Sequence, residues 1–121
     1  KLYVSNPEQN AFYPIWASTF VVSSSKDFKR NVKKLDTSAL DTINAIEVVE
    51  YDLLGDDGEV QKGKRKDIGF IAENTLAVAD EEGKMIDLYR TIALLTKALQ
   101  ESDAKYTALD ARVSKLEKKK G

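Results

Sequence analysis

Cysteine and histidine are both absent from the sequence of 121 residues. Without them the chain can form no disulfide bond and no zinc site built on thiolate or imidazole ligands, and it lacks Cys and His as catalytic nucleophile or base. Any catalysis must therefore use Ser, Lys, Asp, Glu or Tyr. The lack of cysteine also removes the usual indication of redox compartment.

Long apolar runs and a sizeable net charge are missing as well. No stretch approaches the roughly 20 apolar residues of a membrane span, and the first residues have no signal-peptide pattern, so we expect no membrane partner. The 19 Lys and Arg nearly balance the 20 Asp and Glu, and a formal net charge of -1 creates no field that would attract nucleic acid. No nucleic-acid partner is expected. Because the sequence does not begin with Met, we expect a fragment of a longer chain.

The remaining composition, with 42% hydrophobic residues, is that of one globular domain. Residues 1–22 carry little charge, and their second half is rich in aromatic and β-branched side chains, which predicts extended or β structure. Four aromatic residues lie there: Phe12, Tyr13, Trp16 and Phe20. Because so short a segment cannot bury them alone, we expect them to pack on this domain, an upstream domain or another subunit.

The central part of the chain predicts a small α+β domain. Residues 36–46 favour a short amphipathic helix, which Asp36 or Thr37 can cap. Its apolar side chains at helical spacing are Leu40, Ile43 and Ile46. Residues 47–54 predict a strand that turns at residues 55–58 and returns through residues 59–60 as a hairpin.

A second short strand is predicted at Ile68–Ile71. Its continuous apolar character indicates a buried strand, and Gly69 marks a place where a neighbour comes close. The globular part is therefore expected to consist of a β-hairpin and a short helix.

From Asp87 onward, apolar positions repeat at alternating steps of three and four residues, which predicts a long helix with a heptad seam of about four repeats. The seam consists of Leu88, Ile92, Leu95, Leu99, Tyr106, Leu109, Val113 and Leu116, with the polar Ser102 in one core position. In a parallel assembly Lys105 would meet Asp110 of the neighbouring helix, and Arg112 would meet Glu117. Both pairs have opposite charge.

The same helix could instead pack on its own domain. That alternative stays open for the first half, where Leu94 beside Leu95 makes the apolar face broad. Over residues 99–118 the seam is narrow and flanked by charge, which favours self-association. The mixture of core residues is compatible with two or three strands.

Without Cys and His, the remaining combination of nucleophile and base is a serine beside a lysine kept neutral by desolvation. Ser24 and Lys29 are five positions apart where the apolar segment becomes polar. Because Ser and Lys are common, this spacing alone does not distinguish a catalytic pair from solvated surface residues.

No metal ion and no cofactor is expected. The acidic turn with Asp56, Asp57 and Glu59 lacks the ligand pattern of a calcium loop. The basic stretch at residues 62–66 lacks the glycine-rich loop that binds phosphate, and it is expected to be an exposed loop.

Five segments occur in the order of a known family. They are Ser24–Val32, Ala39–Ile46, Tyr51–Asp52, Ile68–Glu73 with the sequence I-G-F-I-A-E, and Ile86–Glu101. Together they resemble the endosialidase-type intramolecular chaperone domain at the C-terminus of phage tail spikes, tail fibres and neck appendages, over residues 23 to about 117. The first segment resembles the family motif S-D-x-x-x-K-x-N-I, with Ser25 in place of the Asp.

The resemblance implies a homotrimeric, auto-processing chaperone. It would help an upstream fibre or spike domain of the same chain to trimerise and then release itself as a single-turnover serine peptidase. Ser24 would be the nucleophile and Lys29 its general base. The bond between Ser23 and Ser24 is the favoured scissile bond, and the bond between Ser24 and Ser25 is the alternative.

The resemblance also implies how the chain is divided. Residues 1–23 would be the C-terminal end of the upstream fibre, and residues 24–121 the chaperone domain. The helix from about residue 87 would form a parallel trimeric coiled coil. The precursor would be a virion tail or appendage protein assembled in the host cytoplasm, and its chaperone part would leave after cleavage.

Two alternatives remain on the sequence alone. The first is a structural trimerisation domain or receptor-binding tip that stays attached, in which Ser24 and Lys29 are ordinary surface residues. The second is the homologous domain that processes membrane-tethered transcription factors of the myelin regulatory type, but the sequence contains no DNA-binding segment to support it.

Overall fold

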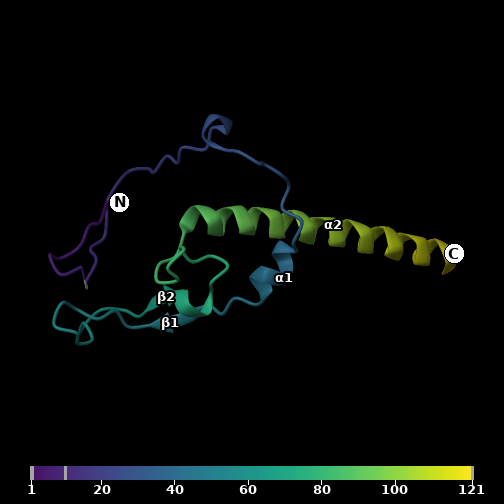
Figure 1. The fold of residues 1–121 in the computed structure, drawn as a ribbon. Helices are drawn as coiled ribbons and strands as arrows, with labels where there is room; N and C mark the ends of the chain where they lie inside the picture. Colours follow the sequence, from purple (N-terminus) through teal and green to yellow (C-terminus); the bar gives the residue numbers. More distant parts are fainter. Residues whose placement is uncertain (1, 10, 121) are drawn as a thin grey trace. The chain divides into compact units, whose positions relative to one another are not determined.

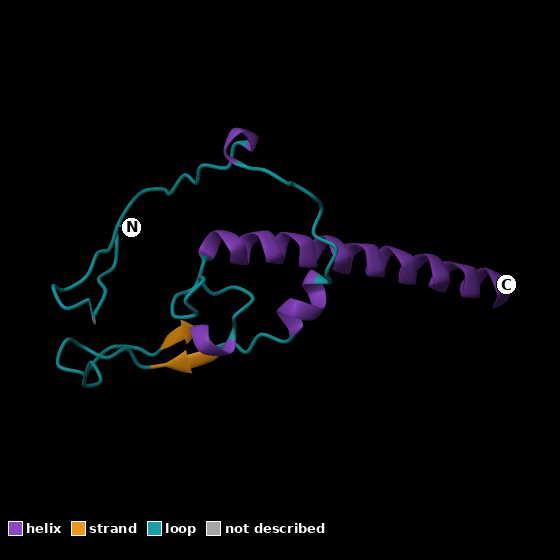
Figure 2. Ribbon diagram, viewed as in Figure 1, coloured by secondary structure: helices purple, strands orange, loops and turns teal. Residues whose placement is uncertain are grey.

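The computed structural model describes residues 2–9 and 11–120, and it has the predicted α+β class. Its elements in chain order are η1 (Lys26–Phe28), α1 (Ala39–Asn44), β1 (Val49–Tyr51), β2 (Asp67–Gly69), η2 (Ala72–Asn74) and α2 (Leu88–Lys120) (Figures 1 and 2). The chain forms two compact units. The first contains Lys1–Asn31 and Val48–Gly69, and the second contains Val32–Glu47 and Phe70–Gly121.

The sheet of the first unit consists of β1 and β2, which run antiparallel with Val49 opposite Gly69 and Tyr51 opposite Asp67 (Figure 2). The sequence predicted a return through residues 59–60, but only a single bridge between Leu54 and Val60 forms there. The partner of β1 is β2, which follows a second turn at residues 62–63. A positive φ at Gly58 and at Gly63 permits these two turns.

The prediction of a buried strand at Ile68–Ile71 was wrong in its burial. Ile68 is 75% exposed, because side chains alternate between the faces of a strand and a two-stranded sheet covers neither face completely. The close approach expected at Gly69 is confirmed. A Cβ at that position would lie 3.2 Å from the hydroxyl oxygen of Tyr51 on the paired strand.

The N-terminal segment is extended, as predicted, but forms little sheet. Ser5 and Phe12 make one antiparallel bridge, and the ring of Phe12 lies 6.1 Å from that of Tyr3, measured between centroids. Residues 13–22 form neither helix nor strand. Trp16 is 91% exposed, so packing of the aromatic side chains on an upstream domain or another subunit stays a prediction.

In the second unit α1 packs against the first half of α2 (Figure 1). Two small residues are buried there: Ala39 of α1 completely, and Ala98 of α2 with 5% of its surface exposed. The helix α1 is capped by Ser38, whose hydroxyl accepts a hydrogen bond from the Asp41 N–H at 3.2 Å. The expectation that Asp36 or Thr37 would cap it was wrong, because α1 begins at Ala39 and Ser38 directly precedes it.

Two side chains of α2 hold the beginning of α1. The Glu101 carboxylate accepts hydrogen bonds from the backbone N–H groups of Ala39 at 3.2 Å and Leu40 at 2.6 Å. The Lys97 ammonium donates to the carbonyl oxygen of Thr37 at 2.5 Å and lies 3.8 Å from Glu101. Glu101 therefore satisfies backbone donors that a helix N-terminus otherwise leaves unpaired, and its charge is favourable at that end of the helix dipole.

The segment between η2 and α2 supplies the rest of this small core. Val78 is completely buried, and Thr75 and Ala79 are buried beside it. Asp87 directly precedes α2, and its carboxylate accepts the N–H of Arg90 in the first turn at 2.9 Å.

The pKa of Glu73 in η2 lies below its usual range. The first cause is a backbone hydrogen bond, and the second is the Lys84 ammonium, which lies 3.2 Å from the Glu73 carboxylate.

The 33 residues of α2 make a helix about 50 Å long, which confirms the predicted long helix. The domain-facing side includes Thr91 and Ala98, which are buried. All eight apolar seam residues are exposed, and Leu99, next to Ala98, is 73% exposed. From residue 102 to residue 120 every side chain is exposed. The first half of α2 thus packs on its own domain with a different face from the seam.

We predict that Glu101→Ala destabilises the second unit. Loss of a charged acceptor shared by two backbone N–H groups should lower the free energy of unfolding by about 2 kcal/mol. Urea denaturation followed by circular dichroism measures the effect. Gln100→Ala, an exposed neighbour on the same helix, is the matched control, and equal midpoints for the two variants would contradict the capping role.

Candidate functional site

Ser24 and Lys29, the pair that the sequence selected, lie in contact in the first unit. The Lys29 Nζ donates a hydrogen bond to the Ser24 Oγ at 2.5 Å. Both side chains are exposed, as is Ser23 on the other side of the favoured scissile bond. The contact is one that a catalytic serine and its base require.

A tight local turn brings the two side chains together. The three residues of η1 form a 3-10 turn between them, in which the Phe28 N–H donates to the Ser25 carbonyl oxygen at 3.2 Å and the Lys29 N–H donates to the Lys26 carbonyl oxygen at 3.1 Å. The Ser25 hydroxyl accepts the N–H of Asp27 at 3.1 Å. The chain therefore doubles back within six residues, and Lys29 returns to Ser24.

Chemically, this pair can act as nucleophile and general base once the lysine is neutral. A neutral amine at hydrogen-bond distance can take the hydroxyl proton, whereas an ammonium can only donate. Removal of water around a lysine favours its neutral form. Both side chains lie on the surface of the single chain.

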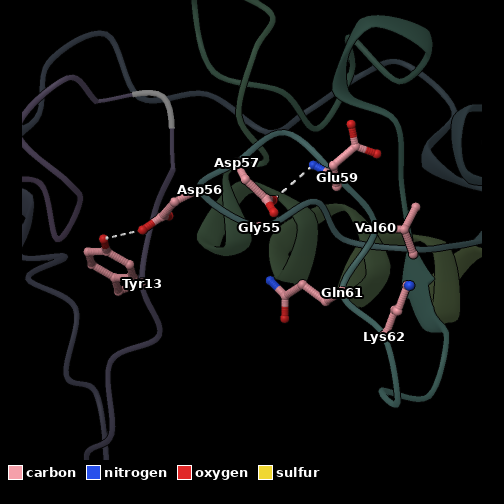
Figure 3. Close-up of a pocket in the computed structure, with 8 residues that line it drawn as sticks. All are labelled: Tyr13, Gly55, Asp56, Asp57, Glu59, Val60, Gln61 and Lys62. Carbon is pink, nitrogen blue, oxygen red and sulfur yellow. Dashed lines mark hydrogen bonds between the residues drawn. The ribbon is translucent and has the colours of Figure 1, made fainter.

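An open cleft of about 1110 Å³ lies elsewhere in the first unit. It is lined by Tyr13, Gly55, Asp56, Asp57, Glu59, Val60, Gln61 and Lys62 (Figure 3). Across it the Tyr13 hydroxyl donates to the Asp56 carboxylate at 3.2 Å (Figure 3). Desolvation, and then the bond to Asp56, raise the pKa of Tyr13 above its usual value.

This cleft contains none of the residues of the Ser24 and Lys29 loop. Its polar lining consists of acidic and amide side chains with Tyr13 and Lys62, and it contains no serine. Sequence reasoning missed the contact between Tyr13 and Asp56, because the two residues are 43 positions apart and no local pattern links them. The acidic turn itself was visible in the sequence.

Two kinds of site were sought in the part of the chain that the structure describes, a cluster of metal ligands and a membrane-spanning helix. Among residues 2–9 and 11–120, no three acidic, His or Cys side chains gather in a way that could hold a metal ion. Within the same residues, no helix combines the length and the apolar character that crossing a bilayer demands.

Comparison with known families matches residues 24–84 to the family described as chaperone of endosialidase. Because the match covers half of the chain, the chain belongs to this family. The family's name also classes it among the peptidases. The match begins at Ser24 and ends before α2. No curated protein and no solved structure matches the chain.

We predict that Asp56→Asn lowers the pKa of Tyr13 toward its usual value, because it removes a negative charge that disfavours the phenolate. Desolvation, the larger cause, remains, so the shift is partial. A pH titration of the Tyr13 ring carbon by NMR measures it. Asp57→Asn is the control, since Asp57 bonds the Glu59 N–H instead. A Tyr13 titration unchanged by Asp56→Asn would show that the contact does not form in solution.

Proposed function

We propose that this domain is a homotrimeric intramolecular chaperone of a phage tail fibre or spike that releases itself by cleaving its own chain. Membership of the chaperone family gives the class. The observation that carries the cleavage is the 2.5 Å contact between Lys29 Nζ and Ser24 Oγ, at the residue where the family match begins. The chain extending upstream of Ser24 is then the client.

The proposed reaction is an intramolecular acyl shift followed by hydrolysis. Neutral Lys29 takes the Ser24 hydroxyl proton while Oγ attacks the carbonyl carbon of Ser23. The bond from that carbon to the Ser24 nitrogen breaks, and the proton on Lys29 passes to the leaving amine, which leaves an ester on Oγ. Water, activated by Lys29, hydrolyses the ester, so the products are a Ser23 carboxylate, a Ser24 amine and the restored hydroxyl.

Ring size favours the bond before Ser24 over the bond after it. Attack on the preceding carbonyl passes through a five-membered ring, whereas attack on Ser24's own carbonyl would close a strained four-membered ring. We therefore propose residues 1–23 as the end of the mature fibre and residues 24–121 as the released chaperone. Release would trap the assembled fibre kinetically, because the chaperone is no longer attached for the reverse reaction.

The seam on α2 supports a coiled-coil assembly. Leu99 and Tyr106 are more than two-thirds exposed, and such an apolar stripe on a helix is ordinarily covered by another helix. The packing of α1 leaves this stripe open, since α1 occupies the face that contains Ala98. We propose three parallel copies, the number that the family resemblance favours.

Assembly and cleavage would be coupled if a neighbouring subunit desolvates the exposed pair. A lysine surrounded by water stays protonated at neutral pH, and a covered lysine can lose its proton. Cleavage would then wait until the chains have associated. This order protects the function, because a chaperone cut before trimerisation would leave its client unassembled.

The dyad is tested by the intact mass of the expressed chain and of its variants. The parent should yield two fragments that sum to the whole and join at Ser24, while Ser24→Ala and Lys29→Ala should each remain one uncut chain. Lys29→Arg should also remain uncut, because a guanidinium keeps the charge but cannot act as a base near neutral pH.

Lys33→Ala removes one positive charge from the same exposed segment and is the matched control, which should cut as the parent does. A parent that stays whole and still trimeric would instead indicate a structural trimerisation or tip domain. Cutting by Lys29→Arg would eliminate the lysine as general base.

The assembly is tested with Leu99→Asp/Leu109→Asp, which places charge in two core positions of the seam. We expect a trimer for the parent and a monomer for the variant by sedimentation velocity. Gln100→Asp/Thr107→Asp carries the same charge on an exposed face beside the seam and should remain trimeric. If the monomeric variant cuts at the parent rate, cleavage does not depend on assembly.

A further inference from the structure

We propose that Ser25 is a positioning residue for the self-cleavage, because its hydroxyl holds the turn that presents Lys29 to Ser24. This inference rests on the proposed function, and it concerns how the reactive pair is assembled. Ser25 itself does not touch the reacting bond in the favoured reaction. Its effect passes through the backbone of η1.

The proposal rests on the hydrogen bonding at the start of η1. Ser25 is the N-cap residue, with φ of -63° and ψ of 143°, and its hydroxyl accepts the Asp27 N–H at 3.1 Å. Its carbonyl oxygen accepts the Phe28 N–H at 3.2 Å. Ser25 thus accepts two of the backbone N–H groups of the first turn after the nucleophile, one through its side chain and one through its carbonyl oxygen.

The turn itself is short and exposed. The 3-10 segment buries none of its residues, and Phe28 is largely exposed. A three-residue turn without tertiary packing depends on its local hydrogen bonds, because so short a helical segment is not stable alone. The Ser25 hydroxyl contributes a side-chain hydrogen bond to the backbone of this turn.

The geometry beyond the turn depends on the same bond. Lys29 is the C-cap residue of η1, and its N–H donates to the Lys26 carbonyl oxygen at 3.1 Å. Asn31 follows with a left-handed φ of 55°, a conformation that Asn tolerates. If the cap is lost and the turn opens, Lys29 is no longer returned to the Ser24 hydroxyl.

Substitution at Ser25 tests the inference through the rate of cleavage. Ser25→Ala removes the cap and should slow cleavage about fivefold, the population change expected for loss of an N-cap hydrogen bond. Ser25→Asp and Ser25→Asn restore an N-cap acceptor of equal rank and should cut within about twofold of the parent. A pulse-labelled translation followed by mass analysis gives the rates.

A merely structural role is distinguished by two further measurements. Ser25→Ala should keep the pH profile of the parent at lower amplitude, because Lys29 is still the base, and should keep the parent's melting temperature, because η1 buries nothing. Ser114→Ala, the same change at an exposed position of α2, controls for loss of a hydroxyl. Cleavage by Ser25→Ala at the parent rate, or no rescue by Asp and Asn, would overturn the proposal.

A second readout separates this inference from the proposed function. If the parent does not cut at all, the self-cleavage fails, but the positioning of Lys29 can still be measured by NMR in the intact chain. The nuclear Overhauser effect between Lys29 Hε and Ser24 Hβ should weaken about fivefold in Ser25→Ala and keep its intensity in Ser25→Asp. An unchanged intensity in Ser25→Ala would refute the role of Ser25.

Discussion

The carboxylate of Glu101 is the interaction on which the second unit depends. The helix α1 has only six residues, too few to be stable alone in water. Two hydrogen bonds from its first backbone N–H groups to one charged side chain fix its beginning on α2. Lys97, one turn before Glu101, donates to the carbonyl oxygen of Thr37 beside them.

This arrangement leaves α2 with two separate tasks. Thr91 and Ala98 occupy one heptad position and are buried against the domain. Ile92 and Leu99, one residue further along, are exposed to solvent. If α1 had used the apolar seam as its docking surface, the helix could not also associate with copies of itself. The small residue Ala98 is buried on the domain side, and the large apolar residues of the seam stay exposed.

The sequence predicted the parts of the structure that arise from local patterns. The heptad spacing from Leu88 to Leu116 was sufficient to locate α2, because a long periodic helix is the clearest local signal. The sequence did not reveal the pairing of β1 with β2, because two glycine turns lie between the strands. The predicted burial of Ile68 was too high, because apolar character does not say whether a second layer covers a strand. Glu101 could not be identified as a cap, since its partners are 61 and 62 positions away.

The contact between Ser24 and Lys29 is local, yet spacing alone did not distinguish it from an ordinary surface pair. The N-cap of Ser25 and the short 3-10 turn create that contact.

The hydrogen bond between Tyr13 and Asp56 connects residues on opposite sides of Ser24. Under the proposed division, one partner belongs to the client and the other to the chaperone. After the peptide backbone breaks, this exposed hydrogen bond, whose net contribution is modest, would still have to be lost before the two pieces separate. Hydrolysis and departure become successive events with separate rates, and the assembled fibre would pass through a nicked complex in which the chaperone is no longer covalently attached but has not yet diffused away.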